Sequence, residues 1–417
     1  MESPAAMEGA SAGGEDLYEE LLARGAVEGI DQPEGRLWFV DSAGRLLAER
    51  DSPHISREQA VTEALAVLSH ETLPSLEAIG HRVVHGGPKH FSPELVTPEL
   101  LADLRAHAAW APLHIPASLR VIETLRAKRP DLPQVACFDT AFHTRMPEVA
   151  ARLPLPRHFY DQGIRKYGFH GLSYEYLLSV LREEAQGRLI MAHLGNGASM
   201  VACADGVPVE TTMGMTPIGG FMMGTRTGDL DPGVLLYLMR EHGYDDKRLE
   251  QLLDKESGLK GVSGRTSDVR TLLELRAEGD EAATMAVEMF CYQARKTVGA
   301  LAVALGGLDR LVFTGGIGEN AAPIRELICR GLEHLGVRLD PARNQEARPS
   351  AAGSQRAASS PGSSDSARRD KTGIRRSRAP VWVISSAGTP CTVMVIPTNE
   401  ELMIARHTYR LVFGGGD

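Results

Sequence analysis

The sequence consists of two blocks in which short strand-like runs are followed by alternating helices and strands. In the first block, strand-like runs between residues 25 and 50 include the turn DSAG, and helical patterns follow at 56–69, 98–108 and 116–128 before the buried run PQVACFD. The second block opens with RLIMAHL, ASMVACAD and VPVETTM and continues with helices, the strand RLVFT, the turn GGIGEN and another helix. This repeated order predicts a duplicated α/β domain with a cleft between the copies.

The length and the charge of the chain limit the classes of function. A chain of 417 residues is long for one hydrophobic core, so two domains are expected. The net charge of -9 argues against a nucleic-acid-binding surface and against a basic membrane-binding face. Small anionic substrates remain compatible with this charge, because a local cluster of arginines can oppose the overall sign.

The location of the protein is also predicted from what the sequence contains. No apolar run reaches the roughly 18 residues of a membrane span, and the N-terminal stretch is acidic, without the basic and apolar regions of a signal peptide. We therefore expect a cytoplasmic protein. The cysteines are scattered without C-x-x-C spacing, which indicates buried reduced thiols and not disulfides or zinc ligands. They are Cys137, Cys203, Cys291, Cys329 and Cys391.

Two segments fall outside the α/β pattern. Residues 1–16 are small and acidic and are expected to be disordered. Residues 343–379 are rich in Ser, Ala and Arg and contain almost no large apolar residue, so they cannot bury enough surface to offset the entropy of ordering. This second segment is interpreted as a flexible, solvated surface insertion, although its basic character could also attract an anionic partner.

The two glycine-bearing turns are candidate phosphate-binding or nucleotide-binding loops. In HLGNGAS, Gly195 and Gly197 remove the Cβ atoms that would keep an anion from the backbone, and His193 and Asn196 add side-chain donors. An ordinary Asn-Gly hairpin turn is the alternative. The second turn, TGGIGEN, follows a strand and precedes a helix, but neither the dinucleotide nor the P-loop fingerprint is present. A nucleotide would therefore bind between separated loops.

Two arginines are candidates for binding an anionic substrate. Arg226 lies in a stretch of Gly and Thr, where a guanidinium can fold over a phosphoryl group; pairing with Asp229 or Asp231 in a structural turn is the alternative. Arg82, in HRVVHGG, is a candidate carboxylate or phosphate clamp, and a surface arginine at the start of a strand is equally compatible with this motif.

Four further residues are candidate site residues, three of them with a structural alternative. His114 lies between two prolines, where a satisfied core histidine is the more common reading. Asp139 ends a buried strand, where α/β folds bind ligands, or else it caps the next turn. His170 follows an aromatic pair in KYGFHG. Glu400 is either a magnesium ligand or simply an acid that is favoured at a helix start.

Eight motifs together, in this order, resemble those of the acetokinase family. They are HRVVHGG, APLH, FDTAFH, RKYGFHG, HLGNGAS, MGTRTGDLDP, TGGIGEN and IPTNEEL. The resemblance runs from about Gly25 to the C-terminus, apart from the Ser/Arg-rich insertion. It implies an actin-like fold of two duplicated α/β domains and a homodimer. It also implies Mg²⁺-dependent (or Mn²⁺-dependent), reversible transfer of the γ-phosphoryl group of ATP to acetate or another short carboxylate, which gives an acyl phosphate and ADP.

The resemblance also implies roles for individual residues. Arg82 and Arg226 match the arginines that hold the carboxylate and the phosphoryl group. His170 matches the histidine that stabilises the transferring phosphoryl group, and His114 matches another active-site histidine. Asp139 matches the catalytic aspartate, for which we favour positioning over general base catalysis because acetate has no proton to lose. The residues that match the apolar pocket for the methyl group are Val84, Leu113, Phe169 and Pro217.

The same resemblance assigns the nucleotide and metal sites. Glu400 matches the magnesium ligand. The phosphate loop is His193, Leu194, Gly195, Asn196 and Gly197, and the remaining nucleotide contacts are Asp268, Val269, Arg270, Gly316, Ile317, Gly318, Glu319 and Asn320. The expected domains are an acyl-substrate domain over 17–139, to which 400–417 returns, and a nucleotide-binding domain over 140–399.

The sequence departs from the family at its N-terminal side. No N-x-G-S-S-S-x-K loop precedes Tyr18, so we expect the first β-hairpin of the N-terminal domain to be missing and the kinase activity to be reduced or absent. Two other functions are considered: a propionate or butyrate kinase, and a catalytically impaired nucleotide-binding protein of the same fold.

Overall fold

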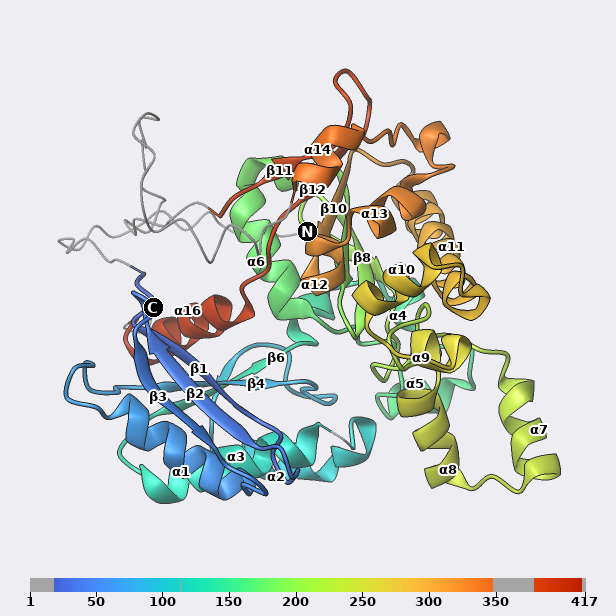
Figure 1. Ribbon diagram of the computed structural model, residues 1–417. Helices are drawn as coiled ribbons and strands as arrows, with labels where there is room; N and C mark the ends of the chain where they lie inside the picture. The colour runs from blue at the N-terminus through green and yellow to red at the C-terminus, as the bar shows by residue number, and fades with distance from the viewer. Residues whose placement is uncertain (1–18, 113, 348–378, 415–417) are drawn as a thin grey trace, which may run out of the picture.

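The computed structural model describes residues 19–112, 114–347 and 379–414 (Figure 1). Its largest sheet has six strands in the order β11-β12-β10-β7-β8-β9. The strands β7, β8 and β9 form the predicted antiparallel meander, and β10 pairs in parallel with both β7 and β12. The bounds are β7 Arg188–Leu194, β8 Ala198–Ala204, β9 Val207–Thr211, β10 Arg310–Thr314, β11 Trp382–Val383 and β12 Thr392–Val395.

The central strands of this sheet are buried on both faces, because most of their residues are apolar. Ile190 and Ala192 of β7 belong to the core that includes helix α11 (Glu281–Leu305). Leu189 and Met191 point to the opposite face, where they pack with residues of α6 (Gly171–Leu181). Alternation with a period of two therefore places successive side chains in two cores, as expected of strands covered by helices on both sides.

The N-terminal third contains two smaller sheets. β1 (Ala23–Glu28), β2 (Arg36–Asp41) and β3 (Leu46–Asp51) form an antiparallel meander, which confirms the strands expected there. The second sheet has the order β4-β6-β5, with β4 and β6 parallel. Its strands are β4 Ile79–Val83, β5 Glu94–Leu95 and β6 Gln134–Phe138, and the nearby helices are α1 Arg57–Leu68, α2 Pro98–Ala106 and α3 Ile115–Lys128.

The last helix, α16 (Glu400–Val412), packs against β4, β6 and α6. Gly80 of β4 allows this contact, because a Cβ atom there would lie 2.4 Å from Ile404 Cγ2 and 2.4 Å from Thr408 Oγ1. Helix α16 thereby joins the small sheet β4-β6-β5 to α6, a helix that covers the large sheet (Figure 1).

The remaining helices lie mainly in the second half of the chain. Figure 1 shows α7 and α8 projecting away from the sheets. The α-helices are α4 Glu148–Ala151, α5 Arg157–Asp161, α7 Pro232–His242, α8 Asp246–Gln251, α9 Gly258–Ser263, α10 Val269–Ala277, α12 Gly315–Asn320, α13 Ala322–Cys329 and α14 Pro341–Glu346. The short helical turns are η1 Ala108–Trp110, η2 Ala141–Arg145, η3 Arg182–Ala185, the π-helical η4 Leu252–Glu256 and η5 Glu333–Leu335.

The structure corrects two of the sequence-based expectations. GGIGEN is not an open turn but the short helix α12, since the Glu319 carboxylate accepts a hydrogen bond from the Gly315 N–H at 3.0 Å. The predicted flexible insertion does not begin at 343, because α14 extends to Glu346 and Asn344 is buried. The rest of that segment up to 378, and the predicted disordered residues 1–16, lie outside the described residues.

The five cysteines are buried and none forms a disulfide, as predicted. No helix in the described part of the chain is both long and apolar enough to cross a membrane.

Candidate active site

Arg82 and Asp139 lie together where two parallel strands end. Arg82 is near the end of β4 and Asp139 directly follows β6, and the Asp139 N–H donates to the Val83 carbonyl at 3.1 Å. The Arg82 guanidinium donates to both carboxylate oxygens, Nε to Oδ1 at 3.0 Å and Nη2 to Oδ2 at 2.6 Å. Asp139 is buried and raises the pKa of Arg82. The turn-cap alternative for Asp139 is therefore wrong, because Thr140 and not Asp139 precedes the helical turn η2. Arg82 is exposed, as its surface alternative predicted, but it lies near the end of its strand and not at the start.

Glu400 approaches this pair from the first turn of α16. Its Oε2 lies 3.4 Å from Arg82 Nε, so the guanidinium lies between two carboxylates. Burial raises the pKa of Glu400 to about 7; the Arg82 charge acts against this shift and Asp139 adds to it. Glu400 is thus more than a helix-start acid, because it faces charged groups from another element.

His170 occupies a strained backbone position at the start of α6. Its φ of 58° is left-handed, a conformation that a non-glycine residue rarely adopts. The following Gly171 donates its N–H to the Asp139 carbonyl at 2.9 Å, and a Cβ atom on Gly171 would lie 2.2 Å from that oxygen. The motif FHG therefore brings the beginning of α6 directly against the end of β6.

The rings of His170 and His193 are stacked, with centroids 4.2 Å apart and an interplanar angle of 17°. His193 comes from the end of β7, so the pair joins the large sheet to the start of α6. Burial holds the pKa of His170 well below its usual value, with further lowering by His193, Arg82 and Arg226. Burial, with Arg82, also lowers the pKa of His193 to about 4. Both rings are therefore neutral at pH 7.

The turn that follows β7 is open towards these histidines and towards Arg226. The turn closes the β7–β8 hairpin, with the Gly195 N–H donating to the Gly197 carbonyl at 3.0 Å. A Cβ atom on Gly197 would lie 3.2 Å from Arg226 Nη1 and 3.5 Å from His170 Nε2. Two donors thus converge on space that only glycine leaves free. HLGNGAS is therefore a hairpin turn, as its structural alternative predicted, and it also borders this space. Phosphate binding by this turn stays a prediction.

Asn196 is fixed against the loop that carries Arg226. The Asn196 carbonyl accepts a hydrogen bond from the Gly224 N–H at 2.9 Å. A Cβ atom on Gly224 would lie only 2.1 Å from the side-chain oxygen of Asn196, so glycine is needed at this position. This contact holds the hairpin turn and the loop at 224–226 side by side.

Arg226 is held by a residue that the sequence analysis missed. Its Nε donates to Asp254 Oδ1 at 2.7 Å, and its Nη1 donates to the Pro217 carbonyl at 3.3 Å. The alternative partners are wrong, because Asp229 accepts the Gly220 N–H and Asp231 caps α7. Asp254 lies in the π-helical turn η4, and no motif marks this position.

His114 precedes α3 and faces the same charged groups. Burial lowers its pKa, and the Arg226 charge acts in the same direction, whereas Asp254 acts in the opposite one. Its ring is partly exposed and makes no hydrogen bond among the described residues, so it is not a satisfied core histidine.

The expected apolar pocket residues lie at the edge of the main core. Phe169 is buried in the large core, and Val84 packs against it. Pro217 is buried and contributes its carbonyl to Arg226. Leu113 lies outside the described residues. The ring of His85 contacts those of Phe169, Tyr167 and Trp110, with centroids 4.6–5.5 Å away.

The second glycine-rich segment adjoins the first, because both follow neighbouring parallel strands. Thr314 at the end of β10 is in register with His193, and a Cβ atom on Gly315 would lie 2.8 Å from the Leu194 carbonyl. The Glu319 carboxylate, predicted to face the nucleotide, accepts the N–H groups of Gly315 and Thr398, and burial raises its pKa.

Helix α12 is fixed by a buried arginine that the motif reading overlooked. Arg325 Nη1 donates to the carbonyls of Gly318 and Glu319, both at 2.9 Å, and Asn320 Nδ2 donates to the Gly316 carbonyl. The side chain of Ile317 packs against the main core. The exposed residues of this helix are Gly316 and Asn320.

The third predicted nucleotide segment is a helix start. Asp268 caps α10 by accepting the Thr271 N–H at 3.0 Å, Val269 is buried in the core, and Arg270 is exposed. The carboxylate of Asp268 thus already has a structural partner, and Arg270 is the side chain of the three that is free to turn towards solvent.

The carboxylates of Asp139 and Glu400 suit a hard divalent cation. Magnesium in phosphoryl-transfer sites is bound by one or two carboxylates together with waters and substrate phosphates, so a larger protein cage is not needed. The described residues indeed contain no group of three or more acids, histidines or cysteines that could hold a metal. The raised pKa of Glu400 reflects a buried carboxyl that a nearby cation would favour in its ionised form.

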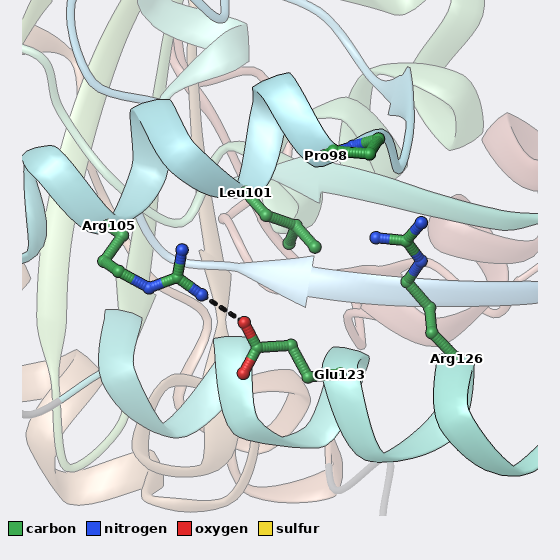
Figure 2. Close-up of a pocket in the computed structure, with 5 residues that line it drawn as sticks. All are labelled: Pro98, Leu101, Arg105, Glu123 and Arg126. Atoms are coloured by element: carbon green, nitrogen blue, oxygen red, sulfur yellow. Dashed lines mark hydrogen bonds and ion pairs between the residues drawn. The ribbon is translucent and has the colours of Figure 1, made fainter.

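A separate hollow of about 290 Å³ lies between α2 and α3 (Figure 2). Its lining contains none of the predicted site residues, and an Arg105–Glu123 ion pair bridges the two helices across it. The lining residues are Pro98, Leu101, Arg105, Glu123 and Arg126.

The sequence matches a known family over most of its length. A family model described as the acetokinase family matches residues 14–367. Acetate kinase of Rhodopseudomonas palustris is 48% identical over 363 residues, which cover 85% of this chain and 83% of that protein. Acetate kinase of Coprothermobacter proteolyticus is 39% identical over 409 residues, which cover 95% and 94% of the two chains.

Solved structures are similar over nearly the whole fold. The crystal structure of Porphyromonas gingivalis acetate kinase has a TM-score of 0.78 and 36% identity, with 94% of both chains covered. A propionate kinase from Francisella tularensis has a TM-score of 0.81 and 34% identity, with 94% and 93% covered. The α/β, actin-like fold is thereby confirmed.

Proposed function

We propose that this chain, which belongs to the acetokinase family and is an ATP-dependent carboxylate kinase, phosphorylates acetate. A carboxylate oxygen attacks the γ-phosphorus of ATP and forms a new P–O bond, while the bond from that phosphorus to the β–γ bridging oxygen breaks. The products are acetyl phosphate and ADP. The acceptor is already ionised at pH 7, so no base has to remove a proton.

The observation that carries the proposal is the convergence of Arg226 Nη1 and His170 Nε2 beside Gly197. Phosphoryl transfer depends mainly on alignment and on donors placed where negative charge is spread. A cationic donor and a neutral donor that meet over an open glycine turn supply such an environment. Asp139 supports this reading as a positioning group, because both its oxygens are bound by Arg82.

Mg²⁺ would be held by Glu400 and Asp139, and when bound it would neutralise charge on the phosphate oxygens. Val84, Phe169 and Pro217 would surround the methyl group of the acceptor. The two glycine segments at 193–197 and 316–320 would hold the nucleotide.

Acetyl phosphate formation by the full chain tests the proposal. The purified protein is incubated with ATP, Mg²⁺ and acetate, and the product is trapped as its hydroxamate; Arg226→Ala is the comparison variant. We expect product well above that variant, even if the absolute rate is low. Equal product from both proteins would overturn the proposal.

Propionate is the second candidate acceptor, since one similar structure is that of a propionate kinase. Values of kcat/KM for acetate, propionate and butyrate decide between the acids. A hydrophobic pocket changes kcat/KM by roughly 10- to 200-fold per methylene. A maximum at propionate would replace acetate in the proposal.

A homodimer is proposed with α7 at its interface. This helix has no buried residue, and Val234, Leu236, Tyr237 and Met239 are 41–56% exposed. Apolar side chains gathered on a projecting helix are typical of an interaction surface. Light scattering of the wild type and of Leu236→Asp tests this: we expect a dimer that the substitution weakens. A wild-type monomer would contradict it.

A further inference from the structure

Two chains of hydroxyl groups lie behind the stacked histidines. In the first, Tyr174 Oη is 2.5 Å from Ser199 Oγ, which is 2.8 Å from Nδ1 of His170. In the second, Thr398 Oγ1 is 2.8 Å from Ser173 Oγ, which is 2.9 Å from Nδ1 of His193. Each ring is thus tethered at Nδ1 by a serine, and each serine is bound in turn by a second hydroxyl.

The positions of the protons follow for the first chain. Tyr174 and Ser199 are fully buried, and their side-chain oxygens have no other hydrogen-bond acceptor among the described residues. If Tyr174 donates to Ser199 and Ser199 donates to Nδ1, both hydroxyl protons are bonded. If Nδ1 carried the proton, Ser199 would have to turn towards Tyr174, and the Tyr174 proton would be buried without an acceptor. An unsatisfied buried group costs about 1–3 kcal/mol, so the first arrangement is favoured.

The second chain, from Thr398 through Ser173 to His193, also directs a serine proton to Nδ1 of its histidine. The Thr398 N–H is bound by Glu319 Oε1 at 3.1 Å, which fixes this residue after β12. Thr398 Oγ1 donates to Ser173, and the proton of Ser173 is then directed to Nδ1 of His193.

An Nδ1 that accepts a hydrogen bond leaves the single proton of a neutral imidazole on Nε2. The Nε2 atoms are the ends that face the glycine turn: that of His170 is 3.5 Å from a Cβ position on Gly197, and that of His193 is 3.8 Å from one on Gly195. A bare nitrogen lone pair there would repel phosphate oxygens, whereas an N–H donates to them.

We propose that Ser199 and Ser173 are positioning residues that hold His170 and His193 as Nε2–H tautomers, so that both stacked rings present donors to the transferring phosphate. The inference rests on the proposed function for the identity of the anion. The tautomers themselves are a property of the free protein and can be measured without a substrate.

Nitrogen NMR of the full chain labelled with ¹⁵N-histidine tests the tautomers. The spectra are recorded at pH 7.5 without ligand, and signals are assigned with His170→Gln and His193→Gln variants. We expect protonated Nε2 and unprotonated Nδ1 for both rings. Ser199→Ala should change the signals of His170, and Ser173→Ala those of His193. Protonated Nδ1 in the wild type would overturn the inference, whether or not the protein phosphorylates acetate.

Kinetics of the same variants test the consequence for the reaction. Loss of the hydrogen-bond partner behind a metal-bound histidine costs about 10- to 100-fold in activity. By analogy we expect a loss of about that size in kcat here, with KM for ATP nearly unchanged. Thr211→Val is the matched control, because this buried hydroxyl donates to the Met200 carbonyl and not to a ring. An equal loss of kcat in the control would overturn the specific role of Ser199.

Tyr174→Phe distinguishes tautomer control from simple packing. This variant keeps the ring in place and leaves Ser199 able to donate to Nδ1, so we expect an unchanged tautomer and less than about a 3-fold loss of kcat. If Ser199→Ala does not fold, the His170 tautomer and kcat can still be measured in Tyr174→Phe. A His170 that becomes protonated on Nδ1 in Tyr174→Phe, or a large loss of kcat without a change of tautomer, would contradict the inference.

Discussion

The candidate site has two ends that are built from different interactions. At the charged end, defined by Arg82, Asp139 and Glu400, a guanidinium lies between two carboxylates. At the neutral end, defined by His170, His193 and Gly197, two uncharged rings are tethered by hydroxyl groups beside an open turn. The charged end depends on balanced charges, so removing one partner affects folding as well as binding. The neutral end depends on shape and proton position, so it can be disabled without unfolding the protein.

Removing the arginine of the charged end should have the largest effect. Arg82→Ala leaves Asp139 buried without its bidentate partner. We expect about a 1,000-fold loss of kcat/KM, by analogy with other lost phosphoryl-site arginines. The unfolding free energy should also fall by about 2–3 kcal/mol, less than for a fully buried pair because Arg82 is partly exposed.

Enzyme assays together with urea unfolding measure both effects of Arg82→Ala. The double variant Arg82→Ala with Asp139→Asn is the control, since neutralising the aspartate should restore stability but not activity. An unfolding free energy of Arg82→Ala equal to that of the wild type would show that Arg82 does not stabilise the buried charge of Asp139.

A methyl group in the neutral end should affect activity alone. In Gly197→Ala, the new Cβ atom would occupy the space within 3.2 Å of Arg226 Nη1 and 3.5 Å of His170 Nε2. We expect about a 100-fold loss of kcat, in the range for a displaced transition-state donor, with the melting temperature within about 2 °C of the wild type.

Gly299→Ala is the matched control for that substitution. Gly299 lies within α11 and has open space where a Cβ atom would be placed. Alanine there should leave kcat unchanged and slightly increase stability. Equal activity of Gly197→Ala and Gly299→Ala would show that the space beside Gly197, between Arg226 Nη1 and His170 Nε2, is not used in the reaction.

The buried neutral histidines should give a smaller effect, seen only in acid. Burial lowers the pKa of His143 to about 4, and its Nε2 donates to the Phe169 carbonyl at 2.9 Å. The folded pKa lies below the unfolded value of 6.5, so this group supports the folded state above about pH 6.5. That contribution is lost as the pH falls from 6.5 towards 4.

His143→Gln can keep the bond to Phe169 but cannot take up a proton. We expect its unfolding free energy to fall less than that of the wild type between pH 7 and pH 4, by about 2 kcal/mol. Urea unfolding at pH 7, 5.5 and 4 measures the difference. Parallel pH profiles would show that His143 is not the neutral, buried group described above.

The sequence predicted most of the fold because the relevant signals are local. Alternating and continuous apolar runs marked the strands, and Ser56, which caps α1, marked the start of a helix. The two glycine-bearing segments lie side by side because each follows one of two neighbouring parallel strands of the same sheet. The helical state of 315–320 was missed because it depends on the Glu319 carboxylate and on Arg325, which lies beyond the motif.

The partners behind the site were harder to predict because they come from distant or unmarked positions. Asp254 is 28 residues from Arg226, in a π-helical turn that has no sequence signature. Ser173 lies one helical turn after His170, and Ser199 pairs with His193 across the β-hairpin. Helix and hairpin spacing could have identified these two serines as neighbours of the histidines, but not which ring each would bind.

The most direct test of the central claim is the fate of the carboxylate oxygen. The full chain is incubated with ATP, Mg²⁺ and acetate labelled with ¹⁸O in both oxygens, and the product is examined by ³¹P NMR. Attack of the carboxylate oxygen on phosphorus predicts an acetyl phosphate signal displaced by one ¹⁸O atom bonded to phosphorus. An acetyl phosphate signal without that displacement, or no such product above the Arg226→Ala variant, would contradict the account.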